Sequence, residues 1–188
     1  MGNDSFLDRR MAAAEAVARI RSGMRVLIGS GAAEPQHLVE ALAAKAPELA
    51  DTEVVHLLTL GTAPYAQARF EGHLRHNALF IGPNVREAVR KGTADYTPCF
   101  LSEVPALLRS GRLPIDAALI QVSPPEDGAC SLGVAVDILK AAVETAPYVV
   151  AQVNPRMPRT AGESLVRLDE IDAFVEKEED ILELPASE

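Results

Sequence analysis

Acidic and basic side chains collect in three loops of this sequence. Glu34 lies in GSGAAEP, Glu126 and Asp127 lie in SPPEDG, and Arg156 and Arg159 lie in NPRMPRT. A loop carboxylate can act as a nucleophile or a general base, and an arginine can hold a carboxylate or phosphate through two parallel hydrogen bonds. Each group also has an ordinary role, because an acid before glycine is typical of a turn and the arginines can pair with the acidic C-terminal segment. The two arginines are therefore a candidate anion-binding site, and the three acids are weaker catalytic candidates.

The turn GSGAAEP, residues 29–35, resembles a phosphate-binding loop because small residues lead directly into a predicted helix. It lacks the Lys-Ser/Thr pair of a nucleotide-binding P-loop and the third glycine of a dinucleotide site. The second strand also ends in LLTLGT, without the acidic residue that binds a ribose. A tight strand-to-helix turn without a ligand is an equal alternative, and a nicotinamide-dinucleotide domain ranks low.

The histidines and cysteines show no metal-binding or redox spacing. His37 is predicted on a helix and His56 within a strand, whereas His73 and His76 are expected in a loop at helical spacing. Core or surface roles are favoured over metal ligation for all four. Cys130 has no histidine nearby in sequence, so a small buried thiol is favoured over a nucleophile, and no metal site is predicted.

The stretch IDAALIQVSPPEDGACSLG, residues 115–133, organises the predicted fold. Its apolar first half is typical of a strand buried on both faces of a parallel sheet, and its polar half should leave the sheet at the strand's C-terminal end. Open α/β sheets bind ligands at that edge. The following VAVDILKAAVETA has helical spacing, so the loop is expected at a helix N-terminus.

Strand and helix patterns alternate along the rest of the chain. The predicted helices cover residues 5–21, 35–49, 83–92, 102–111 and 134–146, and further strands cover 24–30, 53–60, 77–82, 96–101 and 148–154. Such alternation predicts an α/β fold with an open, mostly parallel sheet covered by helices. A short helix is expected from Asp169, followed by a loosely held acidic tail or a connection to a further segment.

Composition limits the function classes. The 188 residues suggest one domain, and the net charge of −9 argues against nucleic acid as a partner. No apolar run approaches the ~20 residues of a membrane span, and no secretory signal is apparent. The two cysteines are expected to be free thiols, so we expect a cytoplasmic protein.

Three sequence blocks carry a family resemblance. ADYTPCFLSEVPALLRSG, IDAALIQVSPPEDGACSLGVAVD and VVAQVNPRMPRT resemble the N-terminal domain of the acetyl-CoA hydrolase/CoA-transferase family, which includes 4-hydroxybutyrate and succinyl-CoA:acetate CoA-transferases. The match runs from about Arg9 to Phe174. It implies the fold of the CoA-transferase superfamily (NagB/RpiA/CoA-transferase-like), with residues 1–175 as the N-terminal-type domain and 176–188 as an acidic tail or linker.

The resemblance also implies an activity and a site. Family members move CoA between carboxylic acids through a glutamate of their C-terminal domain, so coenzyme A thioester is a substrate and no cofactor is permanently bound. No counterpart of that glutamate is found, and no catalytic residue is assigned. The positions that match the pocket-facing loops are Ser30, Gly31, Gly61, Thr62, Asn154 and Pro155.

Two functional hypotheses follow from the resemblance. In the first, the chain is the N-terminal domain or subunit of an acyl-CoA:carboxylate CoA-transferase or acetyl-CoA hydrolase. It then lines the acyl/carboxylate side of the site, is inactive alone, needs a C-terminal catalytic domain in cis or in trans, and assembles as a homo-oligomer. In the second, it is a standalone, non-catalytic remnant that binds an acyl group, CoA or another protein.

Overall fold

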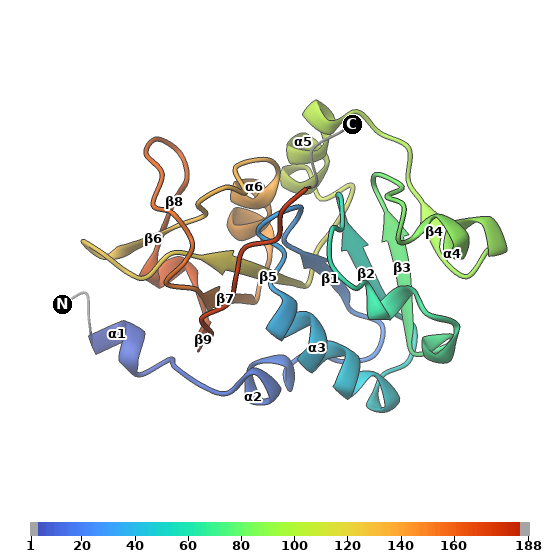
Figure 1. Ribbon diagram of the computed structural model, residues 1–188, viewed down its shortest axis with the longest axis horizontal. Coiled ribbons are helices and arrows are strands. Elements are labelled where there is room, and N and C mark those ends of the chain that lie inside the picture. Colours follow the sequence, from blue (N-terminus) through green and yellow to red (C-terminus); the bar gives the residue numbers. More distant parts are fainter. Residues whose placement is uncertain (1–3, 185–188) are drawn as a thin grey trace.

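A seven-stranded sheet forms the centre of the protein (Figure 1). The structure is a computed structural model that describes residues 4–184. The strands are β1 (Arg25–Ile28), β2 (Thr52–His56), β3 (Leu74–Ala78), β4 (Asp95–Tyr96), β5 (Ala117–Val122), β7 (Val149–Val153) and β9 (Ala173–Glu176). Their order is β4-β3-β2-β1-β5-β7-β9, and every neighbouring pair is parallel. This arrangement confirms the predicted open, mostly parallel α/β sheet.

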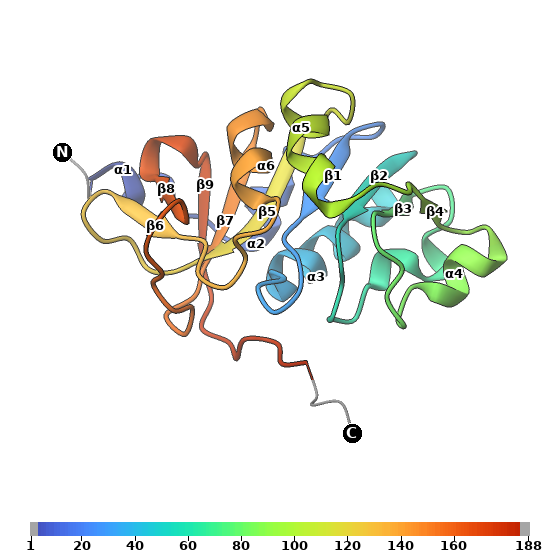
Figure 2. The ribbon, with the colours of Figure 1, turned by 90° about the horizontal axis from the view of Figure 1, so that it is seen from above.

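Helices cover both faces of the sheet (Figure 2). They are α1 (Asp4–Leu7), α2 (Ala13–Val17), α3 (Gln36–Lys45), α4 (Arg86–Lys91), α5 (Val104–Arg109) and α6 (Leu139–Thr145). One core contains Leu108 and Leu139 from α5 and α6, and the other contains Val17 and Leu38 from α2 and α3. The central strands β5 and β7 are buried along their whole length for this reason.

The N-terminal segment differs from the single helix predicted over residues 5–21. It forms α1 and α2 with an extended break between them, because Arg10 pairs with Phe174 of β9 and the Met11 N–H donates to the Phe174 carbonyl at 3.0 Å. Helical spacing of apolar residues is compatible with either arrangement. The break is set by the sheet edge rather than by local propensity.

The loop after β5 does not lead into a helix N-terminus, so this prediction was wrong. It leads into β6 (Ala129–Ser131), which pairs antiparallel with β8 (Leu165–Arg167), and α6 begins only at Leu139. The Ser123 N–H donates to the Ser131 carbonyl at 2.8 Å, so the backbone of this segment is held by a small second sheet. Any anion site based on a helix dipole at this loop is therefore ruled out.

The C-terminal region also differs from its prediction. A single 3-10 turn, Leu168–Glu170, replaces the short helix expected from Asp169, and it leads into the edge strand β9. Residues after β9 contact the main body, because the Leu182 N–H donates to the Ala32 carbonyl at 3.2 Å. The domain boundary placed at residues 175 and 176 stays a prediction.

Two further strands are shifted from their predicted positions. The strand expected over residues 77–82 is β3, which begins at Leu74 and includes His76, and the strand expected over 96–101 is reduced to β4. The last apolar residues of NALFIG and YTPCFL follow β3 and β4 and lie outside the strands. Phe80 and Phe100 are among them, and both are exposed. His76 is thus a buried strand residue, not the loop residue expected.

Candidate functional site

The turns that follow β1 and β2 meet at the C-terminal edge of the sheet. The two strands are parallel neighbours, so their exits lie side by side. Gly31 pairs with Thr59 in an isolated bridge, and its N–H donates to the Leu58 carbonyl at 2.8 Å. The predicted pocket residues Ser30 and Gly31 therefore lie next to the Thr59–Thr62 turn. This turn carries two more predicted pocket residues, Gly61 and Thr62.

A buried carboxylate lies beneath this turn. Glu34 is 1% exposed, and its Oε2 accepts hydrogen bonds from Thr59 Oγ1 at 2.8 Å, Gly61 N at 3.0 Å and Leu60 N at 3.2 Å. Burial raises the pKa of Glu34 above its ordinary value, although the hydrogen bonds from Thr59 and Gly61 oppose this shift. The catalytic candidate Glu34 is therefore a buried acceptor rather than an accessible acid.

A cluster of buried aromatic and imidazole rings packs under the same turn. The Tyr65 hydroxyl lies 2.6 Å from His56 Nδ1, and the His76 ring centroid is 5.2 Å from that of Tyr65. Burial lowers the pKa of His56 to about 3, and burial with the neighbouring His56 lowers that of His76 to about 4. Sequence reasoning did not predict this cluster, although a histidine inside the apolar EVVHLLTL strand indicates a buried imidazole.

Asn154 and Pro155 lie at the end of β7, on the same edge of the sheet but two strands away from β1. Asn154 is fully buried, and its Nδ2 donates to Gln121 Oε1 at 2.7 Å and to the Glu179 carbonyl at 2.8 Å. Gln121 in turn donates to the Glu34 carbonyl at 3.3 Å. The Gln121 side chain thus links Asn154 to the backbone of Glu34, three residues after Gly31.

The candidate anion-binding arginines are engaged by acids of the same chain. Arg156 pairs with Glu178 at 3.1 Å and with Asp180, so it holds the acidic segment after β9. Arg159 pairs with Glu126 at 3.1 Å. The Arg156 contacts match the predicted ion pair with the acidic C-terminal segment, whereas Arg159 pairs with the loop acid Glu126 instead. An anion-binding role for either arginine stays a prediction.

The remaining reactive groups fall outside this edge or are buried. Cys130 is fully buried in β6, as predicted, and burial raises the pKa of its thiol to about 12. Asp127 is exposed in the turn before β6, with a positive φ of 52°. Within residues 4–184, no group of three or more His, Cys, Asp or Glu side chains is arranged to hold a metal ion.

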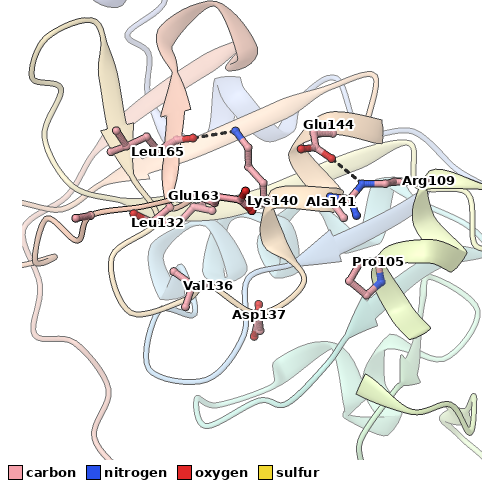
Figure 3. Close-up of a pocket in the computed structure, with 12 residues that line it drawn as sticks. Pro105, Arg109, Leu132, Val136, Asp137, Lys140, Ala141, Glu144, Glu163 and Leu165 are labelled. Carbon is pink, nitrogen blue, oxygen red and sulfur yellow. Dashed lines mark hydrogen bonds and ion pairs between the residues drawn. The ribbon is translucent and has the colours of Figure 1, made fainter. Parts of the chain in front are cut away.

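Three of the hollows around the sheet bear on the site. One of about 660 Å³ lies between α5, α6 and the loop before β8, and its cations are already paired: Lys140 donates to the Leu165 carbonyl and Arg109 to Glu144, both at 2.8 Å (Figure 3). None of the predicted pocket residues lines it. A second of about 660 Å³ is lined by Thr62 with residues of α3 and of the 64–73 segment. A third, apolar groove of about 190 Å³ is lined by Phe80, Leu101 and neighbouring residues.

Comparisons with known proteins agree with this arrangement. The acetyl-CoA hydrolase/transferase N-terminal domain family matches residues 3–184. The 4-hydroxybutyrate coenzyme A transferase of Clostridium kluyveri is 43% identical over 95% of this chain and 42% of its own length. The succinyl-CoA:acetate/propanoyl-CoA:succinate CoA transferase of Fasciola hepatica is 41% identical over 81% of this chain and 32% of its own length. The chain thus spans less than half the length of these relatives.

Solved structures show the same fold. RipA from Yersinia pestis superposes with a TM-score of 0.92 at 27% identity, covering 98% of this chain and 46% of RipA. The 4-hydroxybutyrate CoA-transferase of Porphyromonas gingivalis gives a TM-score of 0.83 at 33% identity, covering all of this chain and 44% of that protein. Among residues 4–184, no helix is long and apolar enough to cross a membrane. The chain therefore belongs to the acetyl-CoA hydrolase/transferase family, of which it carries the N-terminal domain.

Proposed function

We propose that this chain is the N-terminal half of an acyl-CoA:carboxylate CoA-transferase or acetyl-CoA hydrolase, and that it lines the acyl/carboxylate side of an active site completed by a C-terminal domain. The observation that carries the proposal is the 43% identity with a CoA transferase over 95% of this chain but only 42% of that relative. Acyl-CoA and a small carboxylate are the substrates, no cofactor is held permanently, and cytoplasmic location and homo-oligomeric assembly belong to the same proposal.

The proposed reaction uses a glutamate of the C-terminal domain. Its carboxylate attacks the acyl-CoA carbonyl and CoA leaves as the thiolate, which forms a mixed anhydride. The thiolate then attacks the glutamyl carbonyl and releases the first carboxylate, which leaves a glutamyl-CoA thioester. An incoming carboxylate reverses both steps to give the new acyl-CoA, whereas water at the thioester gives hydrolysis.

The contribution of this chain to that reaction is a fixed wall. The turns at Gly31 and Gly61 lie side by side, and the open space beside Gly31 lets an acyl group approach the backbone closely. Turns held in one geometry reduce the entropy that the bound substrate must lose. Ser30, Thr62, Asn154 and Pro155 complete the proposed lining.

An exposed apolar surface supports a partner half. Phe80 is 59% exposed and Phe100 is 77% exposed, and they flank the apolar groove at the C-terminal ends of β2 and β3. Monomeric proteins seldom leave such groups together in water. We propose that the C-terminal domain covers this surface, in cis or in trans.

The test is complementation. The region of the Clostridium kluyveri transferase that follows its match to this chain is expressed separately, mixed with this chain, and assayed for exchange of CoA between acetyl-CoA and short carboxylates. Exchange is expected only in the mixture, with a thioester trapped on a glutamate of the added half. Exchange by this chain alone, or a thioester on one of its own acids, contradicts the proposal.

The same exposed surface also favours a second candidate function, a non-catalytic module that binds an acyl group, CoA or a protein. Gel filtration and titration with CoA separate the two. Self-association without catalytic complementation supports the interaction module, and binding of CoA by this chain alone supports an acyl or CoA carrier. Productive complementation excludes both.

A further inference from the structure

Glu34 occupies a position that neither its motif nor the family comparison explains. It follows β1, yet every hydrogen bond of its Oε2 goes to the turn after β2. The carboxylate therefore joins two segments that are 25 to 27 residues apart in sequence. Both segments carry residues of the proposed acyl/carboxylate wall.

The turn depends on this acceptor. The N–H groups of Leu60 and Gly61 point inward, beyond the last paired residue of β2, His56. A partly buried N–H group that loses its acceptor destabilises the conformation that holds it. A single carboxylate oxygen satisfies both and also accepts from the Thr59 hydroxyl.

Two further side chains hold the turn from its other sides. Gln36 Oε1 accepts from the Thr62 N–H at 3.3 Å, and Asn84 Nδ2 donates to the Gly61 carbonyl at 2.8 Å. A Cβ at position 61 would overlap the Gln36 side-chain amide, so glycine is needed for this close approach. The Thr59–Thr62 turn is thus fixed by Glu34, Gln36 and Asn84 together.

The same geometry argues against Glu34 as a nucleophile or general base. Glu34 is 1% exposed and lies beneath the turn, and His56 Nε2 is 4.0 Å from Oε2, which is beyond hydrogen-bond reach. A nucleophile needs access to a thioester carbonyl. Glu34 Oε2 instead accepts hydrogen bonds from the Thr59 hydroxyl and from the N–H groups of Leu60 and Gly61.

We propose that Glu34 is a positioning residue, which fixes the Thr59–Thr62 turn through its role as a hydrogen-bond acceptor and so shapes the wall that faces the acyl group or carboxylate. This inference rests on the proposed function for its catalytic consequence. Its structural part, the fixing of the turn, does not.

Three variants test the proposal: Glu34→Gln, Glu34→Ala and the matched control Glu40→Gln, an exposed acid on α3. Glutamine keeps an acceptor oxygen but no negative charge, whereas alanine removes both. Thermal unfolding first establishes that each variant is folded. Amide hydrogen exchange of Leu60 and Gly61 is then measured by NMR in the 188-residue chain, and the KM and kcat for CoA exchange are measured in the complemented enzyme.

We expect Glu34→Ala to reduce protection of both amides at least tenfold and kcat/KM at least tenfold, mainly through KM for the carboxylate. Glu34→Gln should stay within about threefold of the wild type in both measurements, and Glu40→Gln should match the wild type. A folded Glu34→Gln that is as inactive as Glu34→Ala would show that the charge itself is required, and unchanged amide protection in Glu34→Ala would show that the turn does not depend on Glu34. Either result overturns the proposal. If the wild-type chain supports no CoA exchange at all, the proposed function fails, while the amide measurement still decides the role of Glu34.

Discussion

Acidification should destabilise this protein through its two buried strand histidines. His56 and His76 are each 1% exposed, and burial lowers their pKa values to about 3 and about 4 in the folded state. Tyr65 lies against both rings, and Glu34 lies near His56. Burial disfavours the charged form of these imidazoles, so the folded protein holds them neutral.

The sign and size of the effect follow from proton uptake. The unfolded chain protonates both histidines near pH 6.5, whereas the folded chain does so only near pH 4 and pH 3. Because the unfolded state binds more protons between these values, the free energy of unfolding falls as the pH falls. A difference of one proton gives about 1.4 kcal/mol per pH unit, so two histidines give up to about 3 kcal/mol per unit and roughly 4 kcal/mol from pH 6.5 to 4.5. The raised pKa of Glu34 acts in the opposite sense and reduces this total.

Urea unfolding followed by circular dichroism at pH 8, 6.5, 5.5 and 4.5 measures this loss. A loss of roughly 4 kcal/mol is a large part of the ~5–15 kcal/mol of a typical domain. His56→Gln and His76→Gln should each remove about half of the pH dependence. The stability of each variant at pH 8, where imidazoles are neutral in both states, isolates the packing cost. A wild-type stability that is flat from pH 6.5 to 4.5, or variants with the wild-type slope, would refute the reasoning.

Three further predictions concern packing and thiol reactivity. Gly133→Ala should lower the free energy of unfolding in urea by more than ~2 kcal/mol. The reason is that φ is +61° and the new Cβ would overlap Met157 and lie 2.9 Å from the Pro158 carbonyl oxygen. Wild-type stability would contradict this prediction. Phe174→Ala should cost ~3–5 kcal/mol by the same measurement, because the ring is fully buried in β9, and a cost below 1 kcal/mol would contradict the placement of that strand. Cys99 should react with a thiol reagent at pH 8 well before the buried Cys130, and equal rates in the folded protein would contradict the burial of Cys130.

Local sequence was sufficient for the centre of the sheet and insufficient for its margins. The run Ala117–Val122 is apolar except for Gln121 and is buried throughout, which is the environment of a central strand. Strand β9 has the short sequence AFVE next to an acidic run, so nothing local separates it from a helix end. Its place is decided by pairing with β7, a contact between residues more than 20 positions apart.

The candidate site was predictable in its parts but not in its assembly. Glycines and polar residues after β1 and β2 mark ligand-edge turns, and this edge was expected. The contact of Gly31 with Thr59 requires the strand order, which no local pattern supplies. The burial of Glu34 and the cluster of His56, Tyr65 and His76 follow from the same assembly, because each residue becomes buried only when β2 pairs with β1 and β3. The pocket role of the predicted residues stays a prediction.

The acids at the C-terminal edge of the sheet are held by contacts within this chain, which concerns the source of the nucleophilic carboxylate. Glu34 lies beneath a turn with three hydrogen bonds on one oxygen, Glu126 pairs with Arg159, and Glu178 pairs with Arg156. A carboxylate that attacks a thioester must reach the carbonyl carbon, which the buried Glu34 cannot do, and Glu126 and Glu178 are held in ion pairs. These acids therefore hold turns and the segment after β9 in place. This arrangement supports the proposed site, in which this chain provides a rigid wall and the C-terminal domain provides the reactive glutamate.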